Sequence, residues 1–316
     1  MIPLKFRKGS MREELYYKPS GGAPFFGLMI TMIVGTLGGA VLSIIYALVN
    51  YYNPFIYFTV IATGIFGAGC GGCAVMGLSL GKVRGRLTNA FAGFIIGFAS
   101  LYLAWVWYLF LAARTAFGQG LFFFDTTAMF SFMQLIAANG MWEIGGATPT
   151  GGILYTIWVI EAFIVLIPAI LIAFSADTPF REPCNQWSEE MDCSVTFRVP
   201  EEIDQLRQSL EDENYSPLFE NALMSPEDVC LHAKIHRCPK CDGSTWLELE
   251  QVSTWLNDKG EAQSSKNTVI KHLAISRQYA DALLTLMPDS TNISSDESSV
   301  MDDDLGEETF QDEELG

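Results

Sequence analysis

The chain has 316 residues, half of them hydrophobic, with a mean hydropathy of +0.24 and a formal net charge of −17. Lys and Arg number 9 against 5 Asp and Glu in residues 1–175, and 10 against 31 in residues 176–316. The acidic second half excludes nucleic acid as an expected partner and argues against contact with an anionic lipid surface, because both depend on clustered Lys and Arg.

Four long apolar runs in the first half predict membrane-spanning helices. A helix needs about 20 consecutive apolar residues to cross the hydrocarbon core of a bilayer. Residues 1–23 are hydrophilic and lack the short apolar region and cleavage site of a secretory signal, so we expect the first run to be retained as a span. We therefore expect an α-helical four-span membrane domain over residues 24–175. The runs are residues 24–49, 55–80, 91–113 and 152–173.

The uneven distribution of Lys and Arg predicts the orientation of the spans. Five basic residues lie in residues 1–23 and three in residues 81–90, whereas residues 51–54 have none and residues 114–151 have only Arg114. Cytoplasmic segments carry the excess of Lys and Arg in multi-pass membrane proteins. We therefore expect both termini in the cytoplasm, and a location in the inner cell membrane if the protein is bacterial.

The outer loop, residues 114–151, contains an apolar segment at residues 128–136 that is too short to span a bilayer. A segment of this kind can lie at the membrane interface as a helix, or it can re-enter the bilayer where protein surrounds it. We expect the interfacial helix, and the re-entrant element is the alternative.

Residues 176–287 have the pattern of a small cytosolic α+β domain. Runs that alternate between apolar and polar residues indicate strands, while an acidic start after a proline and an amphipathic run indicate helices. Residues 288–316 form an acidic tail of Ser, Asp and Glu that we expect to be disordered. The expected strands are residues 194–199, 229–236, 246–256 and 268–275, and the expected helices begin at Pro200 and Ser276. For residues 246–256 a helix is the alternative, because Leu249, Val252 and Leu256 also fit helical spacing.

Glu161 is the only acid inside an apolar span, and it lies near the middle of residues 152–173. An ionisable group at this depth is costly, and it indicates by default a functional site that faces the bundle interior, a cavity or a partner. The functional interpretation is a proton or cation site. The structural interpretation, which we favour, is a neutral Glu161 that joins helices by a hydrogen bond to another span.

Pairs of glycines four residues apart recur in the first three spans. This spacing places both glycines on one helix face, where backbones can approach closely, so we expect tight helix packing and allow for self-association. Cys70 and Cys73 lie among apolar residues of the second span and are interpreted as small packing residues. The paired glycines are Gly35 and Gly39, Gly67 and Gly71, and Gly93 and Gly97.

The segment Cys238-Pro239-Lys240-Cys241 resembles the knuckle of a zinc ribbon, in which two thiolates two residues apart grip one metal ion. A tetrahedral zinc site needs two further ligands, and Cys184 and Cys193 are the expected pair. A redox role for the two cysteines of the knuckle, or cysteines without any ligand, are the rival interpretations. The alternative zinc ligands are Cys230, His232 and His236.

These features predict a non-enzymatic membrane scaffold or adaptor whose cytosolic domain binds or presents a protein partner. The chain has no phosphate-binding loop, nucleophile elbow or zinc-protease motif. One alternative is a small transporter or channel that works through Glu161, and another is a membrane thiol oxidoreductase that uses Cys238 and Cys241. The expected partners are the lipid bilayer, an unidentified protein and, through the glycine-rich spans, a second copy of the chain.

Overall fold

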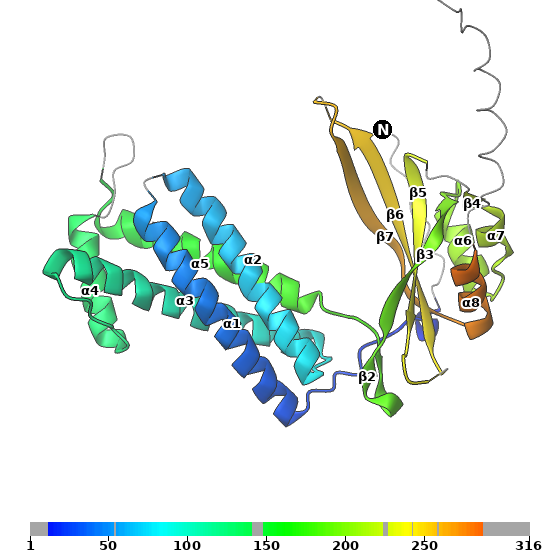
Figure 1. The fold of residues 1–316 in the computed structure, drawn as a ribbon, viewed down its shortest axis with the longest axis horizontal. Helices are drawn as coiled ribbons and strands as arrows, with labels where there is room; N and C mark the ends of the chain where they lie inside the picture. The colour runs from blue at the N-terminus through cyan, green and yellow to red at the C-terminus, as the bar shows by residue number, and fades with distance from the viewer. Residues whose placement is uncertain are drawn as a thin grey trace, which may run out of the picture. The chain divides into compact units, whose positions relative to one another are not determined.

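A computed structural model describes residues 12–53, 55–140, 148–223, 227–241, 243–257 and 259–286. Within these ranges the chain forms two compact units (Figure 1). The membrane unit consists of Tyr17–Glu189 and Cys238–Cys241. The sheet unit consists of the described residues of Met1–Tyr16, Glu190–Arg237 and Asp242–Gly316. The acidic tail that we expect to be disordered lies outside the described residues.

Four helices of the membrane unit are long and apolar enough to cross a bilayer, which confirms the prediction of a helical multi-pass membrane protein. Helices suit this environment because they satisfy their backbone polar groups internally. A shorter helix, α4 (Thr126–Asn139), contains the apolar segment of the outer loop, and the Asp125 carboxylate caps it by accepting a hydrogen bond from the Ala128 amide. The four long helices are α1 (Phe25–Tyr52), α2 (Ile56–Gly81), α3 (Arg86–Phe117) and α5 (Gly151–Phe174).

Two glycines let α5 approach its neighbours closely. A Cβ atom on Gly67 of α2 would lie 2.7 Å from the backbone oxygen of Val165, and one on Gly93 of α3 would lie 2.6 Å from that of Ala169. A backbone oxygen cannot move aside as the end of a flexible side chain can. Both crossings therefore require a residue without a side chain, and they provide the close backbone contact that stabilises helix pairs in membranes.

We expect Gly67→Ala to destabilise the membrane unit by about 1–3 kcal/mol, because the added methyl group forces α2 and α5 apart. Gly64, one turn earlier in α2, is the matched control, since nothing lies within 4 Å of the position of its Cβ atom. Gly64→Ala should leave stability unchanged or raise it slightly, because alanine favours the helix. Thermal unfolding in detergent measures both variants, and equal melting temperatures would contradict this packing.

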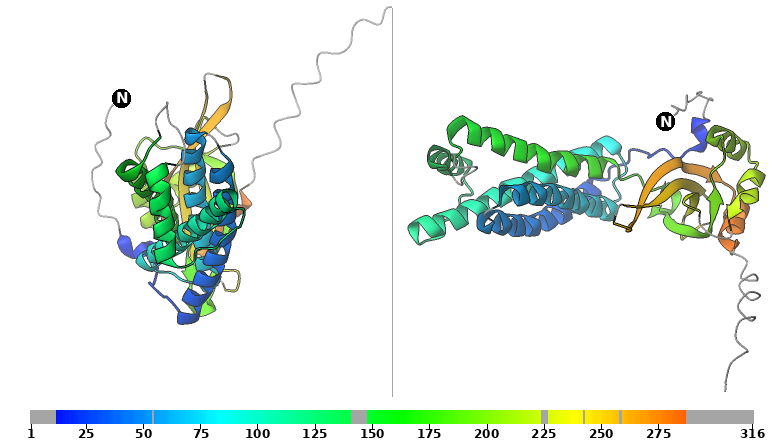
Figure 2. Two further views of the ribbon diagram at one scale, coloured as in Figure 1. Left: turned by 90° about the vertical axis from the view of Figure 1, so that its left-hand side faces the viewer. Right: turned by 90° about the horizontal axis from the view of Figure 1, so that it is seen from above.

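The sheet unit contains a five-stranded sheet with the order β4-β3-β5-β6-β7, which confirms the prediction of a domain that contains a sheet. The pairs β3–β4, β5–β6 and β6–β7 are antiparallel. Three helices lie on one face of the sheet (Figures 1 and 2). The elements are β3 (Glu189–Arg198), α6 (Ile203–Glu211), α7 (Ser216–Glu220), β4 (Ala222–Leu223), β5 (Val229–Arg237), β6 (Thr245–Leu256), β7 (Ala262–Ile275) and α8 (Arg277–Thr285), with a 3-10 turn at Glu13–Leu15.

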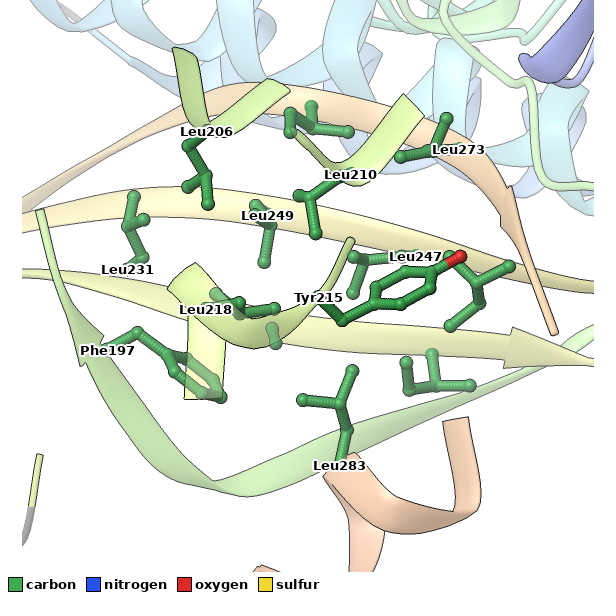
Figure 3. Close-up of a cluster of buried hydrophobic side chains, with 14 of the residues drawn as sticks. Phe197, Leu206, Leu210, Tyr215, Leu218, Leu231, Leu247, Leu249, Leu273 and Leu283 are labelled. Carbon is green, nitrogen blue, oxygen red and sulfur yellow. The ribbon is translucent and has the colours of Figure 1, made fainter. Parts of the chain in front are cut away.

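The hydrophobic core of the sheet unit lies between the sheet and these helices (Figure 3). Leu206 and Leu210 are one helical turn apart in α6, so both side chains face the sheet. Leu247 and Leu249 are two residues apart in β6, so both side chains point from the sheet toward these helices. All four side chains are almost completely buried. Burial stabilises the fold by about 1.5–3 kcal/mol for each such leucine.

Several segments differ from the sequence-based expectation: β3 begins at Glu189 rather than at residue 194, and α7 and β4 were not expected. β7 begins at Ala262 rather than at residue 268, because the turn after β6 is tightly closed: the Asn257 amide donates a hydrogen bond to the Glu261 carbonyl oxygen at 2.9 Å. A small hairpin of β1 (Phe180–Arg181) and β2 (Gln186–Trp187) was not expected, since strands of two residues carry no detectable period. This hairpin belongs to the membrane unit.

Candidate metal centre and intramembrane cavity

Cys184 ends the 3-10 turn Glu182–Cys184 that connects β1 to β2. Basic residues between α2 and α3 fix this turn on both sides of the cysteine. Lys82 Nζ donates a hydrogen bond to the Asn185 carbonyl oxygen at 2.6 Å. Arg84 pairs with the Glu182 carboxylate at 3.0 Å. The position of Cys184 within the membrane unit is therefore determined by contacts of Lys82 and Arg84 that no sequence pattern predicts.

Cys238 and Cys241 lie in the connection between β5 and β6, and this short segment belongs to the membrane unit. The sulfur atoms of Cys184, Cys238 and Cys241 all lie within 4.8 Å of one another, and none of the three forms a disulfide. Zinc–sulfur bonds of about 2.3 Å place the ligands of a tetrahedral ion roughly 3.8 Å apart. The three thiols can therefore hold a metal ion after small side-chain movements.

The electrostatics of Cys184 favour a cation in this group. Hydrogen bonding with the Cys241 thiol, together with burial and the nearby Cys238 thiol, raises the pKa of Cys184 to about 11. Three sulfurs this close resist carrying negative charge together unless a cation lies among them. A metal ion reverses this effect, because it stabilises every thiolate that coordinates it. Among the described residues, no fourth Cys, His, Asp or Glu joins the three cysteines.

The structure does not bring the other expected ligands to this group. Cys193 lies on β3 and packs against the core of the sheet unit, where burial raises its pKa to about 11. Cys230 is buried on β5, and burial raises its pKa as well. His232 is also on β5 and belongs to no group of possible metal ligands among the described residues. The ring of His236 lies against the Glu248 carboxylate instead. Of the four cysteines first expected as ligands, three lie together and Cys193 lies apart.

Glu161 lies at the middle of α5 and lines a cavity of about 110 Å³ in the membrane unit. The Tyr46 hydroxyl of α1 donates a hydrogen bond to Oε1 of Glu161 at 2.6 Å. The same hydroxyl lies 2.8 Å from Oγ1 of Thr63 on α2. Glu161 thus has the interhelical hydrogen bond of the structural interpretation, but its carboxyl group also faces a partly open cavity rather than a sealed helix contact.

Polar groups around this cavity have unused hydrogen-bonding capacity. Oε2 of Glu161 accepts no hydrogen bond from the described residues. Asn50 also lines the cavity, and its Oδ1 atom is buried without a hydrogen-bond partner among the described residues. Aromatic rings form another wall, with Trp105 and Trp158 edge-to-face at a centroid distance of 5.0 Å. The cavity therefore combines a carboxylate, a free amide oxygen and aromatic faces.

Glu161 can be identified from the sequence alone by its charge, but its neighbours cannot. Tyr46, Asn50 and Thr63 are uncharged, so a search for charges inside the apolar runs passes over them. A search for all hydrogen-bonding side chains near the depth of Glu161 would have found them.

In comparisons with known proteins, no family model, no curated protein and no solved structure matched this chain.

Proposed function

We propose that the membrane unit is a small transporter or channel for a monovalent cation that binds at Glu161. The observation that carries this proposal is the partly open cavity into which Glu161 brings a carboxylate oxygen that has no hydrogen-bond partner among the described residues. Charged and polar groups in spans that face a cavity commonly mark ion or substrate pathways. The orphaned Asn50 carbonyl oxygen supports the same site, because buried polar groups normally have partners.

The donors around the cavity favour one positive charge. A single carboxylate balances a monovalent ion, whereas calcium sites usually combine several carboxylates and other oxygen ligands. The hydroxyl oxygens of Thr59 and Thr63 and the amide oxygen of Asn50 are neutral oxygen donors in the same lining. Trp105 and Trp158 add aromatic faces that attract cations. A volume of about 110 Å³ accommodates a small cation with a few waters, since water occupies about 30 Å³ in the liquid.

Uptake by vesicles that contain the purified protein tests this function. Labelled sodium, rubidium and methylammonium are suitable probes of alkali and ammonium cations. Glu161→Gln is the essential comparison, because glutamine keeps the shape and the hydrogen-bond acceptor but removes the charge. Faster uptake of one of these cations by wild-type vesicles than by variant vesicles would support the proposal, and equal uptake would oppose it.

We further propose that both chain termini face the cytoplasm. Residues between α2 and α3 and residues after α5 lie at the same end of the membrane unit, since Arg86 pairs with Asp177 and Arg84 with Glu182. The basic residues of that end are the ones that the positive-inside rule assigns to the cytoplasmic side. Labelling of introduced cysteines from either side of sealed vesicles tests this orientation.

We propose zinc as the metal at Cys184, Cys238 and Cys241. Soft thiolate ligands select zinc, copper(I) and iron–sulfur clusters, and tetrahedral sulfur-rich sites are typical of zinc. The reducing cytoplasm keeps thiols available for a metal instead of a disulfide. This assignment makes metal binding, rather than thiol–disulfide exchange, the chemistry of the knuckle.

A second function, binding of a protein partner, is favoured by the β6–β7 hairpin. Trp255 and Leu256 at the end of β6 are 46% and 71% exposed. All residues from Ala262 to Thr268 in β7 are exposed, and β7 is an edge strand of the sheet. An edge strand offers backbone hydrogen-bonding groups to an added strand, and the exposed apolar pair offers a contact beside it.

We expect a photo-crosslinking residue in place of Leu256 to capture one defined protein, or a second copy of the chain, in native membranes. The same residue in place of Gln208, an exposed position on α6, is the control and should capture nothing specific. Denaturing gels followed by mass spectrometry identify the product. Absence of a product at position 256, or the same product at both positions, would contradict binding through the hairpin.

A further inference from the structure

The sheet unit contains a second group of metal-binding side chains on three adjacent strands. His236 is on β5, Glu248 on β6 and His272 on β7 (Figure 1). All three are buried, with 3%, 9% and 5% of their surface exposed. One ligand atom from each residue lies within 4.8 Å of the other two.

Both imidazole rings converge on the same carboxylate oxygen. Nε2 of His236 lies 3.0 Å, and Nε2 of His272 lies 3.2 Å, from Oε2 of Glu248. Metal–nitrogen and metal–oxygen bonds of about 2.0–2.2 Å place neighbouring ligand atoms of a tetrahedral ion roughly 3.4 Å apart. Small side-chain movements are therefore enough for the three residues to coordinate one ion.

The backbone of β7 is distorted where it presents His272. The register shifts between Leu247 and Leu249, so that Lys271 and His272 together face the single residue Glu248. His272 has a φ of 51°, in the left-handed region that residues other than glycine rarely adopt. Bulges redirect side chains, and strained residues of this kind concentrate at functional sites. The strain thus coincides with the residue that completes the group.

Lys234 does not neutralise Glu248. Lys234 lies directly opposite Glu248 across the β5–β6 pair, yet its ammonium group pairs with Glu190 at 2.9 Å and with Glu250 at 3.3 Å. Two imidazole nitrogens face the Glu248 carboxylate in its place. Two histidines and one carboxylate form a ligand set that is common in zinc and non-haem iron sites.

We propose that His236, Glu248 and His272 form a second metal site, which binds one divalent first-row transition ion in the sheet unit. The site is separate from the cysteine centre, because the two groups share no residue. It is also independent of cation binding at Glu161. The ligands come from three neighbouring strands, so the bound ion cross-links β5, β6 and β7.

Cobalt(II) binding to the full-length, tag-free protein in detergent tests this site. Thiolate ligands give cobalt(II) an intense charge-transfer absorption, whereas imidazole and carboxylate ligands do not, so this charge-transfer band reports the cysteine centre alone. Elemental analysis after gel filtration gives total bound cobalt. We expect the total bound cobalt to be one ion per chain more than the amount at which the thiolate charge-transfer band stops increasing.

His272→Gly is the decisive variant, because glycine adopts the left-handed conformation without strain and the bulge can stay intact. We expect it to lose one cobalt per chain while the thiolate band is unchanged. His232→Ala, on the same strand as His236, should retain the wild-type cobalt content. X-ray absorption spectroscopy of the wild-type protein is a check that needs no variant. The spectrum of the bound metal should contain scattering from two imidazole rings. The proposal is overturned if total cobalt never exceeds the thiolate-bound ion, or if His272→Gly binds as much cobalt as the wild type.

Discussion

We expect Glu161→Gln to abolish cation binding while the membrane unit stays folded. The glutamine amide has nearly the shape of the carboxyl group, and its oxygen can still accept the hydrogen bond from Tyr46. The cation, however, would lose the carboxylate of Glu161, the only acidic side chain among the described residues that line the cavity. Removal of one partner from a buried ion pair costs about 3–5 kcal/mol, which lowers affinity more than about 100-fold.

Thermal unfolding at increasing cation concentration measures this effect. A ligand that binds only the folded protein stabilises it by about 2.7 kcal/mol at 100 times its Kd. The melting temperature of the wild type should therefore rise with the concentration of the preferred cation, and that of Glu161→Gln should not. Tyr46→Phe is the control for the structural hydrogen bond, because it lowers stability but leaves the carboxylate in place. A Glu161→Gln variant with an unchanged cation response would reject the binding site.

The second large effect is expected from Cys238→Ser. Serine is a poor ligand for zinc, so this variant should lose one zinc per chain relative to the wild type, together with the structure that the metal supports. Structural zinc contributes about 10–16 kcal/mol in small zinc-finger peptides. Part of that stabilisation should disappear here, and the melting temperature should fall by many degrees.

Elemental analysis of the full-length protein and thermal unfolding measure both consequences. Cys193→Ser is the matched control, because Cys193 packs against the core of the sheet unit and is not one of the three clustered thiols. This control should retain the wild-type zinc content. If Cys238→Ser and Cys193→Ser hold the same zinc as the wild type, the three cysteines are not a zinc centre.

The membrane architecture could be predicted from the sequence because it depends on length and composition alone. A run of more than 20 uncharged apolar residues, such as that after Pro24, has few structural alternatives to a membrane span. The presence of a sheet-containing domain was predictable for a similar reason, since residues 194–199 and 229–236 alternate with a period of two. The structure contains strands at both places.

The neighbours of each candidate site could not be predicted, because they depend on how distant segments pack. Tyr46 and Glu161 are 115 residues apart, and they meet only because α1 and α5 both pack against α2 and α3. Cys184 and Cys193 are close in sequence, but the first lies in the β1–β2 hairpin and the second on β3. The bulge at His272 shifts the register of β7, so its alignment with Glu248 does not follow from periodicity.

The most direct measurement of the central claim is cation uptake by sealed vesicles that contain the purified wild-type protein, compared with Glu161→Gln vesicles at equal protein content. If Glu161 binds the transported ion, wild-type vesicles should take up sodium, rubidium or methylammonium down its gradient, and Glu161→Gln vesicles should match empty vesicles. Equal uptake by the wild type, the variant and empty vesicles for all three cations would contradict a transport function.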